Sequence, residues 1–275
     1  MALFGGFQER REKKALERYL AAPSIDATEI EELKKACPQA AAVLHDVVKG
    51  SSDRDKRFRA LLGLQSLGIT ADMVPSVLEA LSDDDEFVQE AAAKILRAYG
   101  QYAGAIVPTL IAIYAGHPER REVVLQILTE YGAEARAAAP VLAEGLPQPT
   151  SALAVARCLS RVGIEALDPV DRGIVAILTD RRNAEDVSGL GPALQARLEA
   201  FLLSCVPWRC VDAIPAWRRI LEAYADLGVR PSEPVLRLLN ELTQYTDWKL
   251  RGEVGAQFLE MSRAKVVAEK LVQRT

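Results

Sequence analysis

The sequence predicts an all-α protein, a right-handed α-solenoid of stacked helical hairpins with a period of about 32 residues. Four glycines, at positions 68, 100, 132 and 163, lie 32, 32 and 31 residues apart. Three residue pairs that end in proline, Val74-Pro75, Val107-Pro108 and Ala139-Pro140, follow each other at steps of 33 and 32 residues. Each period therefore predicts one helix that ends at glycine and a second that begins near proline. Because such hairpins bury their apolar faces against their neighbours, this period is typical of a repeat stack.

The composition suits a helical core. Hydrophobic residues make up 49% of the 275 residues and charged residues 26%, while aromatic residues make up only 6%. Alanine and leucine, which dominate the apolar share, are among the strongest helix formers. The formal net charge is −4, and residues 51–150 alone carry 9 basic and 14 acidic side chains, a net of −5. This acidity argues against a general affinity for the phosphate backbone of nucleic acids.

Four cysteines, Cys37, Cys158, Cys205 and Cys210, show no spacing that resembles a disulfide framework. We find no signal peptide and no apolar run near the roughly 20 residues that span a membrane. We therefore expect a cytoplasmic protein with reduced thiols and no stable membrane insertion. The apolar segment ALFGGF at residues 2–7 is expected to be a frayed terminus, and at most a weak hydrophobic hook.

Residues 1–50 are expected to form an N-terminal helical cap, because their helices fall outside the period. A helix over 8–21 alternates acidic and basic residues and ends before Pro23. Further helices are expected over 28–37 and 38–49, with Gly50 ending the last one. Asp26 and Glu29 have the spacing of a capping box.

Residues 51–180 are expected to hold the regular repeats. Four helix pairs are predicted, over 55–67 and 72–81, 87–99 and 104–114, 120–131 and 136–146, and 151–162 and 169–178. Val88, Ala91, Ala92, Ile95, Leu96 and Tyr99 are the expected buried residues of the second pair. Cys158, which lies among Leu153, Val155 and Leu159, is expected to be an inert core thiol.

The acidic run Ser82–Glu86 opens the second repeat and could suggest a metal site. Helix-start chemistry explains it better, because serine and aspartate accept hydrogen bonds from the free N–H groups of a first turn. No glycine or distal glutamate follows at the spacing of a calcium loop. We therefore predict capping here and no metal.

Residues 181–192 are expected to be a loop insertion, and residues 193–275 divergent repeats with C-terminal capping helices. Gly189-Leu190-Gly191 lacks both the preceding strand and the third glycine of a dinucleotide fingerprint. Helices are predicted over 193–205, 216–227, from 234 onward, and over 248–273. Insertions in repeat arrays map to one edge and in some proteins carry binding.

The stretch Leu81–Gly100, followed by Ile106–Glu119, resembles the bacterial HEAT-repeat family. That family combines an acidic turn, a Val-x-x-x-Ala-Ala helix that ends in glycine, and a leucine-rich helix that begins with proline. The matching positions here are Val88, Ala92, Ala93, Gly100, Pro108 and Leu110. Gln89 stands where the family commonly has arginine, which puts one polar contact between repeats in doubt. The resemblance implies a stack with an extended groove suited to a peptide or a partner protein.

The densest tryptophan and arginine cluster supplies the candidate binding residues. Both residue types are enriched at binding hot spots, although tryptophan also fills space at repeat junctions. The predicted partner-binding residues are Trp208, Arg209, Trp217, Arg218, Arg219, Arg181 and Arg182.

No catalytic signature is present, and the two histidines, His45 and His117, lie in different repeats. We therefore expect a non-catalytic scaffold or adaptor with a protein or peptide partner and with no cofactor. Two alternatives come from the resemblance. Some DNA glycosylases that act on alkylpurines have HEAT-like repeats, and Trp208, Trp217 and Trp248 with Arg218, Arg219 and Arg251 could imitate their surface. HEAT-like chromophore lyases are the other alternative.

Overall fold

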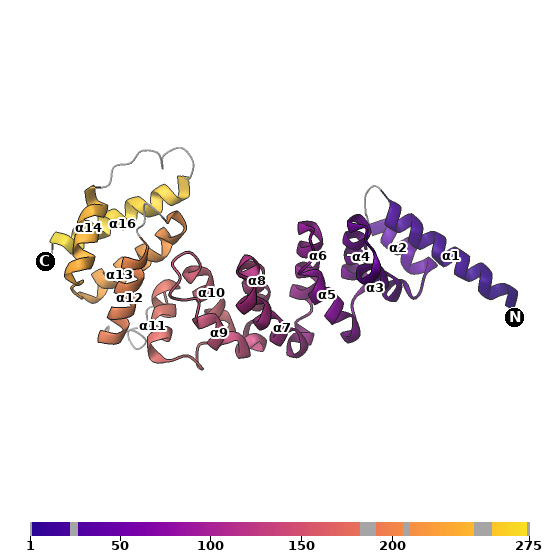
Figure 1. The fold of residues 1–275 in the computed structure, drawn as a ribbon, viewed down its shortest axis with the longest axis horizontal. Helices are drawn as coiled ribbons and strands as arrows, with labels where there is room; N and C mark the ends of the chain where they lie inside the picture. The colour runs from indigo at the N-terminus through magenta and orange to yellow at the C-terminus, as the bar shows by residue number, and fades with distance from the viewer. Residues whose placement is uncertain (1, 23–26, 182–190, 206–209, 245–254, 274–275) are drawn as a thin grey trace. The chain divides into compact units, whose positions relative to one another are not determined.

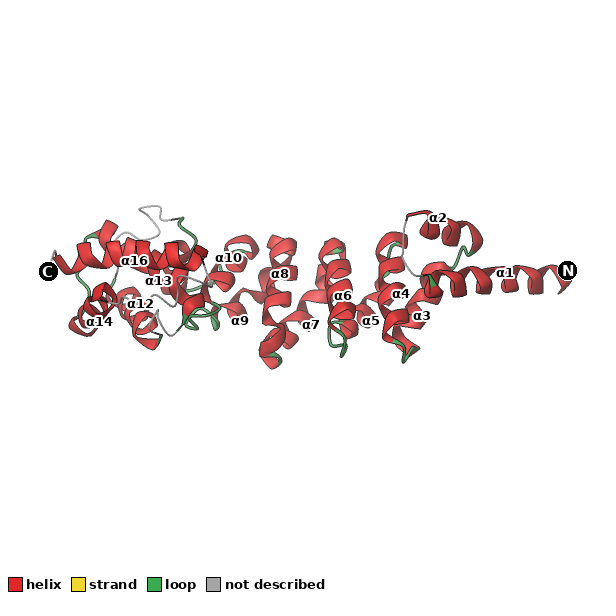
Figure 2. Ribbon diagram, turned by 90° about the horizontal axis from the view of Figure 1, so that it is seen from above, coloured by secondary structure: helices red, strands yellow, loops and turns green. Residues whose placement is uncertain are grey.

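The computed structural model describes residues 2–22, 27–181, 191–205, 210–244 and 255–273, and the side chains of 2–9, 27, 211 and 255–259 lie outside the description. Within these ranges every regular element is a helix, which confirms the predicted all-α class (Figure 2). No helix in the described ranges is both long and apolar enough to cross a membrane. The chain divides into two compact units, residues 1–113 and 114–275.

The first unit contains seven labelled α-helices, the last of which continues into the second unit (Figure 1). These are α1 (Ala2–Ala21), α2 (Ala27–Ala36), α3 (Ala40–Gly50), α4 (Arg54–Leu67), α5 (Val74–Ala80), α6 (Glu86–Ala98) and α7 (Ala103–Gly116), with short 3₁₀ helices η1 (Ala71–Met73) and η2 (Gly100–Tyr102). Helix α4 packs against α3 on one side and α6 on the other, and α5 contacts α3 and α6. Helices α1 and α2 both pack on α4.

Short polar residues and glycine set the ends of these helices. Asp53 and Asp85 cap α4 and α6, and each carboxylate accepts hydrogen bonds from two backbone N–H groups of the first turn. Gly68 ends α4 with a φ of 96°, which L-residues rarely adopt. Gly132 and Gly163 also have positive φ, whereas Gly100 instead begins η2. Three of the four periodic glycines are therefore required by backbone conformation.

The described helices from α8 onward belong to the second unit (Figure 1). They are α8 (Arg121–Tyr131), α9 (Ala139–Ala143), α10 (Ala152–Val162), α11 (Pro169–Leu178), α12 (Pro192–Ser204), α13 (Ile214–Leu227), α14 (Glu233–Gln244) and α16 (Gly255–Gln273), with η3 (Pro118–Arg120), η4 (Gly132–Ala138) and η5 (Val211–Ala213). Helix α10 packs against α8 and α11, and α16 packs against α13 and α14.

The core of each unit follows the predicted apolar positions. The five aliphatic residues expected to be buried in α6 are all buried, and only Tyr99 is partly exposed. Cys158 is fully buried, and burial raises the pKa of its thiol to about 11, against the opposing effect of Thr129. The predicted core position of this thiol is therefore confirmed. In the second unit, Trp217 and Tyr224 are the largest fully buried side chains.

Two expected helices differ from the structure. Helix α1 begins at Ala2, so the expectation of a frayed segment before residue 8 is wrong for the backbone. The helix expected over 136–146 is a 3₁₀ helix, η4, followed by the five-residue α9. Pro140 lies in the first turn of α9, where its missing N–H breaks no hydrogen bond within the helix.

Candidate functional site

A groove in the first unit is lined by α1, α3 and the start of α4. Its volume is about 900 Å³, which lies within the range of ligand-binding pockets. Apolar side chains from two helices line it, namely Leu20 and Ala21 from α1 and Val43 and Val47 from α3. None of these four is buried, so the groove presents apolar surface to a partner.

The polar lining of this groove is mostly acidic. Four carboxylates line it, from Glu17, Asp46, Asp53 and Asp55, against two cations, Lys56 and Arg59, which leaves a formal charge of −2. Asp46 and Asp55 are largely exposed. Lys56 lies 3.7 Å from Asp53, so one cation is already paired inside the groove. Asp55 is paired with Arg54 at 3.6 Å, and the remaining carboxylates, those of Glu17 and Asp46, favour a positively charged occupant.

Tyr19 and Arg59 hold α1 against α4 beside the groove. The Tyr19 hydroxyl donates a hydrogen bond to the backbone oxygen of Arg59 at 3.1 Å. Burial raises the pKa of Tyr19 to about 12, against the opposing effect of the Arg59 charge. Nη1 of Arg59 is buried without a hydrogen-bond partner. Gly63 allows this approach, because a Cβ there would lie 2.4 Å from Cδ1 of Leu44 and 3.0 Å from the Tyr19 hydroxyl.

An aromatic pair with one exposed ring joins α4 to α6. The rings of Phe58 and Phe87 meet edge to face with centroids 6.2 Å apart, a favoured aromatic geometry. Phe87 is 66% exposed, the highest value among the large apolar side chains that the structure describes. Phe58 contacts α6, whereas the groove lies where α4 meets α1 and α3. Asp84 and Glu86 precede Phe87 in the sequence, and both are exposed.

Arg57 fixes the acidic turn that carries Asp84 and Phe87. Its guanidinium donates to both carboxylate oxygens of Asp83 at 2.7 and 2.8 Å and to Asp84 at 2.9 Å. Burial raises the pKa of Asp83, but hydrogen bonds from Arg57 and from the backbone N–H of Asp85 lower it more, so the pKa lies below 3.8. Arg54 pairs with Asp85 at 3.2 Å. The acidic run thus caps α6 and binds arginine, as capping chemistry predicts.

A second groove, of about 340 Å³, lies beside the Arg57–Asp83 pair. It is lined by Val48, Lys49, Arg57, Ser76, Glu79, Ala80, Ser82 and Asp83. Its charges balance, with two cations and two carboxylates, so it offers no preference for either sign. We therefore place the candidate site in the larger groove and the Phe58–Phe87 pair.

His45 and Ser76 form a serine–histidine contact that resembles a catalytic pair. His45 Nε2 lies 2.9 Å from Ser76 Oγ, and the contact joins α3 to α5. Ser76 is buried, and the Asp46 carboxylate lies 3.9 Å from His45 Nδ1, too far to orient the ring by a hydrogen bond. The pair therefore serves as a packed polar contact between α3 and α5.

The predicted tryptophan and arginine cluster does not form a free surface in the described residues. Trp217 is completely buried, and its indole N–H donates to the backbone oxygen of Cys205 at 2.9 Å. Arg218 is paired with Glu222 and Glu260. Trp217 is thus a core residue, which corrects its assignment as a partner contact.

The other predicted partner-binding residues divide into two groups. Arg219 lies 2.7 Å from the Asp180 carboxylate, and Arg181 is exposed at the end of the described segment. Trp208, Arg209 and Arg182 lie outside the described residues, as do Trp248 and Arg251 of the alternative nucleic-acid surface. Of the predicted binding residues that the structure describes, Trp217 and Arg218 belong to the packing of α13 and do not form a binding face.

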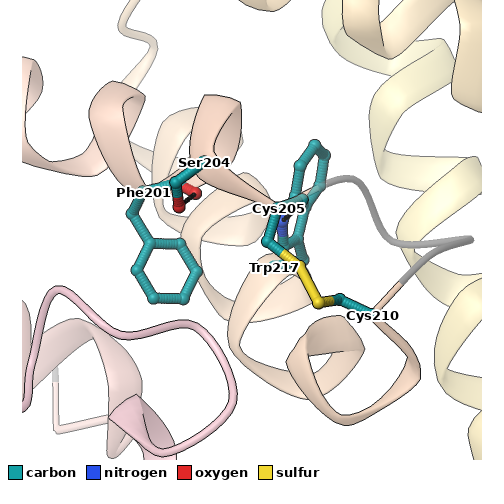
Figure 3. The surroundings of a disulfide bond; sticks show 5 residues. All are labelled: Phe201, Ser204, Cys205, Cys210 and Trp217. Atoms are coloured by element: carbon teal, nitrogen blue, oxygen red, sulfur yellow. Dashed lines mark hydrogen bonds between the residues drawn. A yellow bond between two sulfur atoms is a disulfide. The ribbon is translucent and has the colours of Figure 1, made fainter.

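The expectation of four reduced thiols is wrong for one pair, because Cys205 and Cys210 form a disulfide (Figure 3). The two cysteines flank the junction between α12 and η5, with a Cα–Cα distance of 6.2 Å, in the usual range for a disulfide. Cys37 and Cys158 are free and buried. A spacing of five residues permits the bond only when the turn is tight, which spacing alone does not reveal.

Sequence reasoning missed the groove and the aromatic pair. Their residues come from four helices, and α1 and α3 fall outside the 32-residue period. One signal was present: several contacts join residues about one period apart, such as Ile69 to Tyr99 and His45 to Ser76. An alignment of the successive sequence periods therefore places Phe58 beside the acidic turn that precedes Phe87.

No family model matches the chain, and no curated protein matches it. Solved structures similar to it include two crystal structures of engineered proteins, both targets of the Northeast Structural Genomics Consortium. One is 18% identical with a TM-score of 0.32, over 94% of this chain and 96% of that chain. The other is 16% identical with a TM-score of 0.37, over 97% of this chain and 78% of that chain. Function is therefore argued from the chain's own residues.

Proposed function

We propose that this chain is a non-catalytic scaffold that binds a basic segment of a partner protein. The segment lies in the groove between α1, α3 and α4, and an apolar side chain of the partner packs on the Phe58–Phe87 pair. The observation that carries the proposal is that one unit holds both a groove with an apolar lining and an acidic rim and, on α4 and α6, an aromatic pair with one exposed ring. Exposed apolar surface with a polar rim is typical of protein-binding sites.

The scaffold itself is proposed to be a right-handed, HEAT-like α-solenoid. A repeated contact supports this proposal. Arg57, Gln89 and Arg121 are spaced by 32 residues, and each side chain donates to a backbone carbonyl six or seven residues earlier, at 3.2, 2.6 and 3.1 Å. Gln89, which stands where the HEAT family commonly has arginine, thus keeps the contact within its own repeat. It has no charge with which to bind the next acidic turn as Arg57 does.

Charge complementarity supports a basic partner. The groove carries a formal charge of −2, and Asp84, Glu86 and Glu90 add exposed carboxylates around Phe87. Arg54 is already paired with Asp85. A segment that carries lysine or arginine beside an aromatic or large aliphatic side chain would satisfy both the rim and the aromatic pair.

Two observations support a binding role over catalysis. The one serine–histidine contact in the described ranges has a buried serine and no orienting carboxylate. His117 is exposed, and its ring lies 3.1 Å from the Glu119 carboxylate. No hydrogen bond among the described residues joins this ring to a serine, threonine or cysteine. We retain the cytoplasm as the proposed location.

The test is affinity purification of the tagged full chain from its native cell, with nuclease treatment, read by mass spectrometry. The wild type is compared with Phe87→Ala and Asp46→Lys. Two matched controls are made in the second unit, Val266→Ala for loss of an exposed apolar side chain and Glu241→Lys for the same change in net charge.

The proposal predicts a stoichiometric protein that survives nuclease, is lost with Phe87→Ala and Asp46→Lys, and is retained with both controls. Cross-linking should map the contact to a basic segment of that protein. Loss of all bound material on nuclease treatment would instead favour the nucleic-acid alternative. Equal recovery with all four variants would place the binding site elsewhere and reject the groove.

A further inference from the structure

The disulfide between Cys205 and Cys210 lies at a junction whose backbone is held independently of the bond. The Trp217 indole donates to the Cys205 backbone oxygen at 2.9 Å, and the N–H of Ala213 donates to the Cys210 backbone oxygen at 3.0 Å. Trp217 is fully buried in α13, and Figure 3 shows its indole next to Cys205, to whose backbone oxygen it donates. These hydrogen bonds would keep the two thiols adjacent after reduction.

The bond closes a very short loop. The two cysteines are five residues apart in sequence, and a crosslink stabilises a fold less when the loop that it closes is shorter. Opening this bond should therefore leave the helices around it in place. A disulfide that adds little to stability, and whose thiols stay adjacent after reduction, is suited to thiol–disulfide exchange rather than to a structural role.

The cysteines differ in access. Cys210 is half-buried, whereas Cys205 is only 8% exposed. The free thiols Cys37 and Cys158 are more deeply buried, and burial raises the pKa of both. Thiolate is the reactive form, so these two residues should stay unreactive while the pair exchanges.

We propose that Cys205 and Cys210 form a reversible thiol–disulfide exchange site that reacts with small disulfides such as glutathione disulfide. In oxidation, the Cys210 thiolate attacks one sulfur of the small disulfide, forms a mixed disulfide and releases one thiolate. The Cys205 thiolate then attacks the Cys210 sulfur, closes the bond and releases the second thiolate. The protein loses two protons and two electrons, and the small disulfide becomes two thiols. Reduction by two small thiols runs through the same steps in reverse.

This proposal does not depend on the proposed partner groove, which lies in the other unit. It assigns a modification site to the α12–α13 junction, where the oxidised state covalently joins the end of α12 to the start of η5. The order of attack follows from access, because the half-buried Cys210 meets an external disulfide more readily than Cys205.

The test equilibrates the folded full chain in glutathione buffers of graded reduced-to-oxidised ratio, followed by acid quenching, thiol alkylation and tryptic mass spectrometry. Cleavage after Arg197, Arg209 and Arg218 places the two cysteines on separate peptides, residues 198–209 and 210–218. The proposal predicts that the linked pair of peptides converts to two alkylated peptides, and back again, as the ratio changes. Peptides with Cys37 and Cys158 should show no mixed disulfide with glutathione at any ratio.

The mixed disulfide tests the order of attack. Cys205→Ser should accumulate one glutathione on Cys210, and Cys210→Ser should accumulate at least tenfold less on Cys205. Fluorescence of a Trp208→Phe/Trp248→Phe variant, in which Trp217 is the remaining tryptophan, should rise on reduction, while the circular dichroism of the helices stays constant. A pair that never links under oxidising glutathione, or that resists excess dithiothreitol in the folded protein, would overturn the proposal. Loss of helicity on reduction would also overturn it, because the bond would then be a structural staple.

Discussion

Arg57 donates to both carboxylate oxygens of Asp83, so α4 binds the acidic turn that precedes α6. The two donor–acceptor distances are 2.7 and 2.8 Å, and the side chains are only 14% and 10% exposed. Partly buried, bidentate pairs of this type are stronger and more directional than surface ion pairs. This contact positions the turn that carries Asp84 and Phe87, and it therefore supports the proposed binding surface.

Replacing Arg57 with glutamine, the residue found one period later at position 89, should destabilise the chain. Glutamine can keep the hydrogen bond to the Ser51 carbonyl but leaves the Asp83 carboxylate without its cation. Hydrogen bonds to charged groups contribute roughly 1.5–3 kcal/mol, so Arg57→Gln should lower the free energy of unfolding by about that amount. Urea denaturation followed by circular dichroism measures the change.

Arg54→Gln is the matched control for that experiment. Arg54 pairs with Asp85 at 3.2 Å, but its side chain is largely exposed. Exposed pairs contribute at most about 1 kcal/mol. Equal losses for the two variants would contradict the special role of the Arg57–Asp83 pair.

The same pair predicts a dependence of stability on pH. The pKa of Asp83 is lowered in the folded chain, because the hydrogen bonds of Arg57 outweigh the effect of burial. The stabilisation that this carboxylate provides is therefore full above its unfolded pKa of about 3.9 and is lost as the pH falls through the folded pKa. Wild type should exceed Asp83→Asn in unfolding free energy at pH 6, and the gap should narrow towards pH 3. If the difference in unfolding free energy between the two proteins stays constant from pH 6 to pH 3, the ionised Arg57–Asp83 pair is not the cause of that difference.

Gly68→Ala should destabilise the first unit. Gly68 has a φ of 96°, and a Cβ there would lie 3.3 Å from the Tyr99 hydroxyl, which accepts a hydrogen bond from the Ile69 N–H. The strained backbone should cost about 1–2 kcal/mol in thermal or urea denaturation. Gly104→Ala is the control, since a Cβ there meets no atom within 4 Å and the residue lies in a helix. That variant should be stabilised by up to about 1 kcal/mol.

Phe87→Ala should change stability little, which makes it a clean probe of binding. The ring is 66% exposed, and its main described contact is the edge-to-face pair with Phe58. Loss of that pair should cost no more than roughly 1.5 kcal/mol in urea denaturation. Trp217→Phe, by comparison, removes a buried donor to the Cys205 oxygen and should cost about 1–3 kcal/mol, although position 217 belonged to the predicted binding cluster. The reverse ranking of the two variants would contradict this assignment of core and surface.

Local signals in the sequence predicted the helices well. Capping by the acidic run before α6, and Gly68 and Gly163 as helix ends, follow from backbone chemistry that each residue carries by itself. The buried face of α6 follows from its apolar period. The exception at residues 132–146 arose because a 3₁₀ helix and an α-helix share the same apolar spacing over a few residues.

The binding site could not be predicted in the same way, because it depends on tertiary packing. Trp217 and its neighbouring arginines have the composition of a hot spot, yet Trp217 fills the core and Arg218 binds two glutamates. Amino-acid composition does not indicate which face of a helix packs against the rest of the protein. The groove unites Leu20 of α1 with Val43 of α3, a neighbourhood that exists only once both helices pack on α4.

Selection of random displayed peptides on the full chain tests the central claim most directly. The account predicts enriched peptides that carry lysine or arginine beside an aromatic or large aliphatic residue. Their affinity should fall roughly tenfold or more with Phe87→Ala or Asp46→Lys and stay unchanged with Val266→Ala or Glu241→Lys. Enrichment of neutral or acidic peptides, equal affinity for all four variants, or no enrichment at all would contradict a basic partner segment in the groove of α1, α3 and α4.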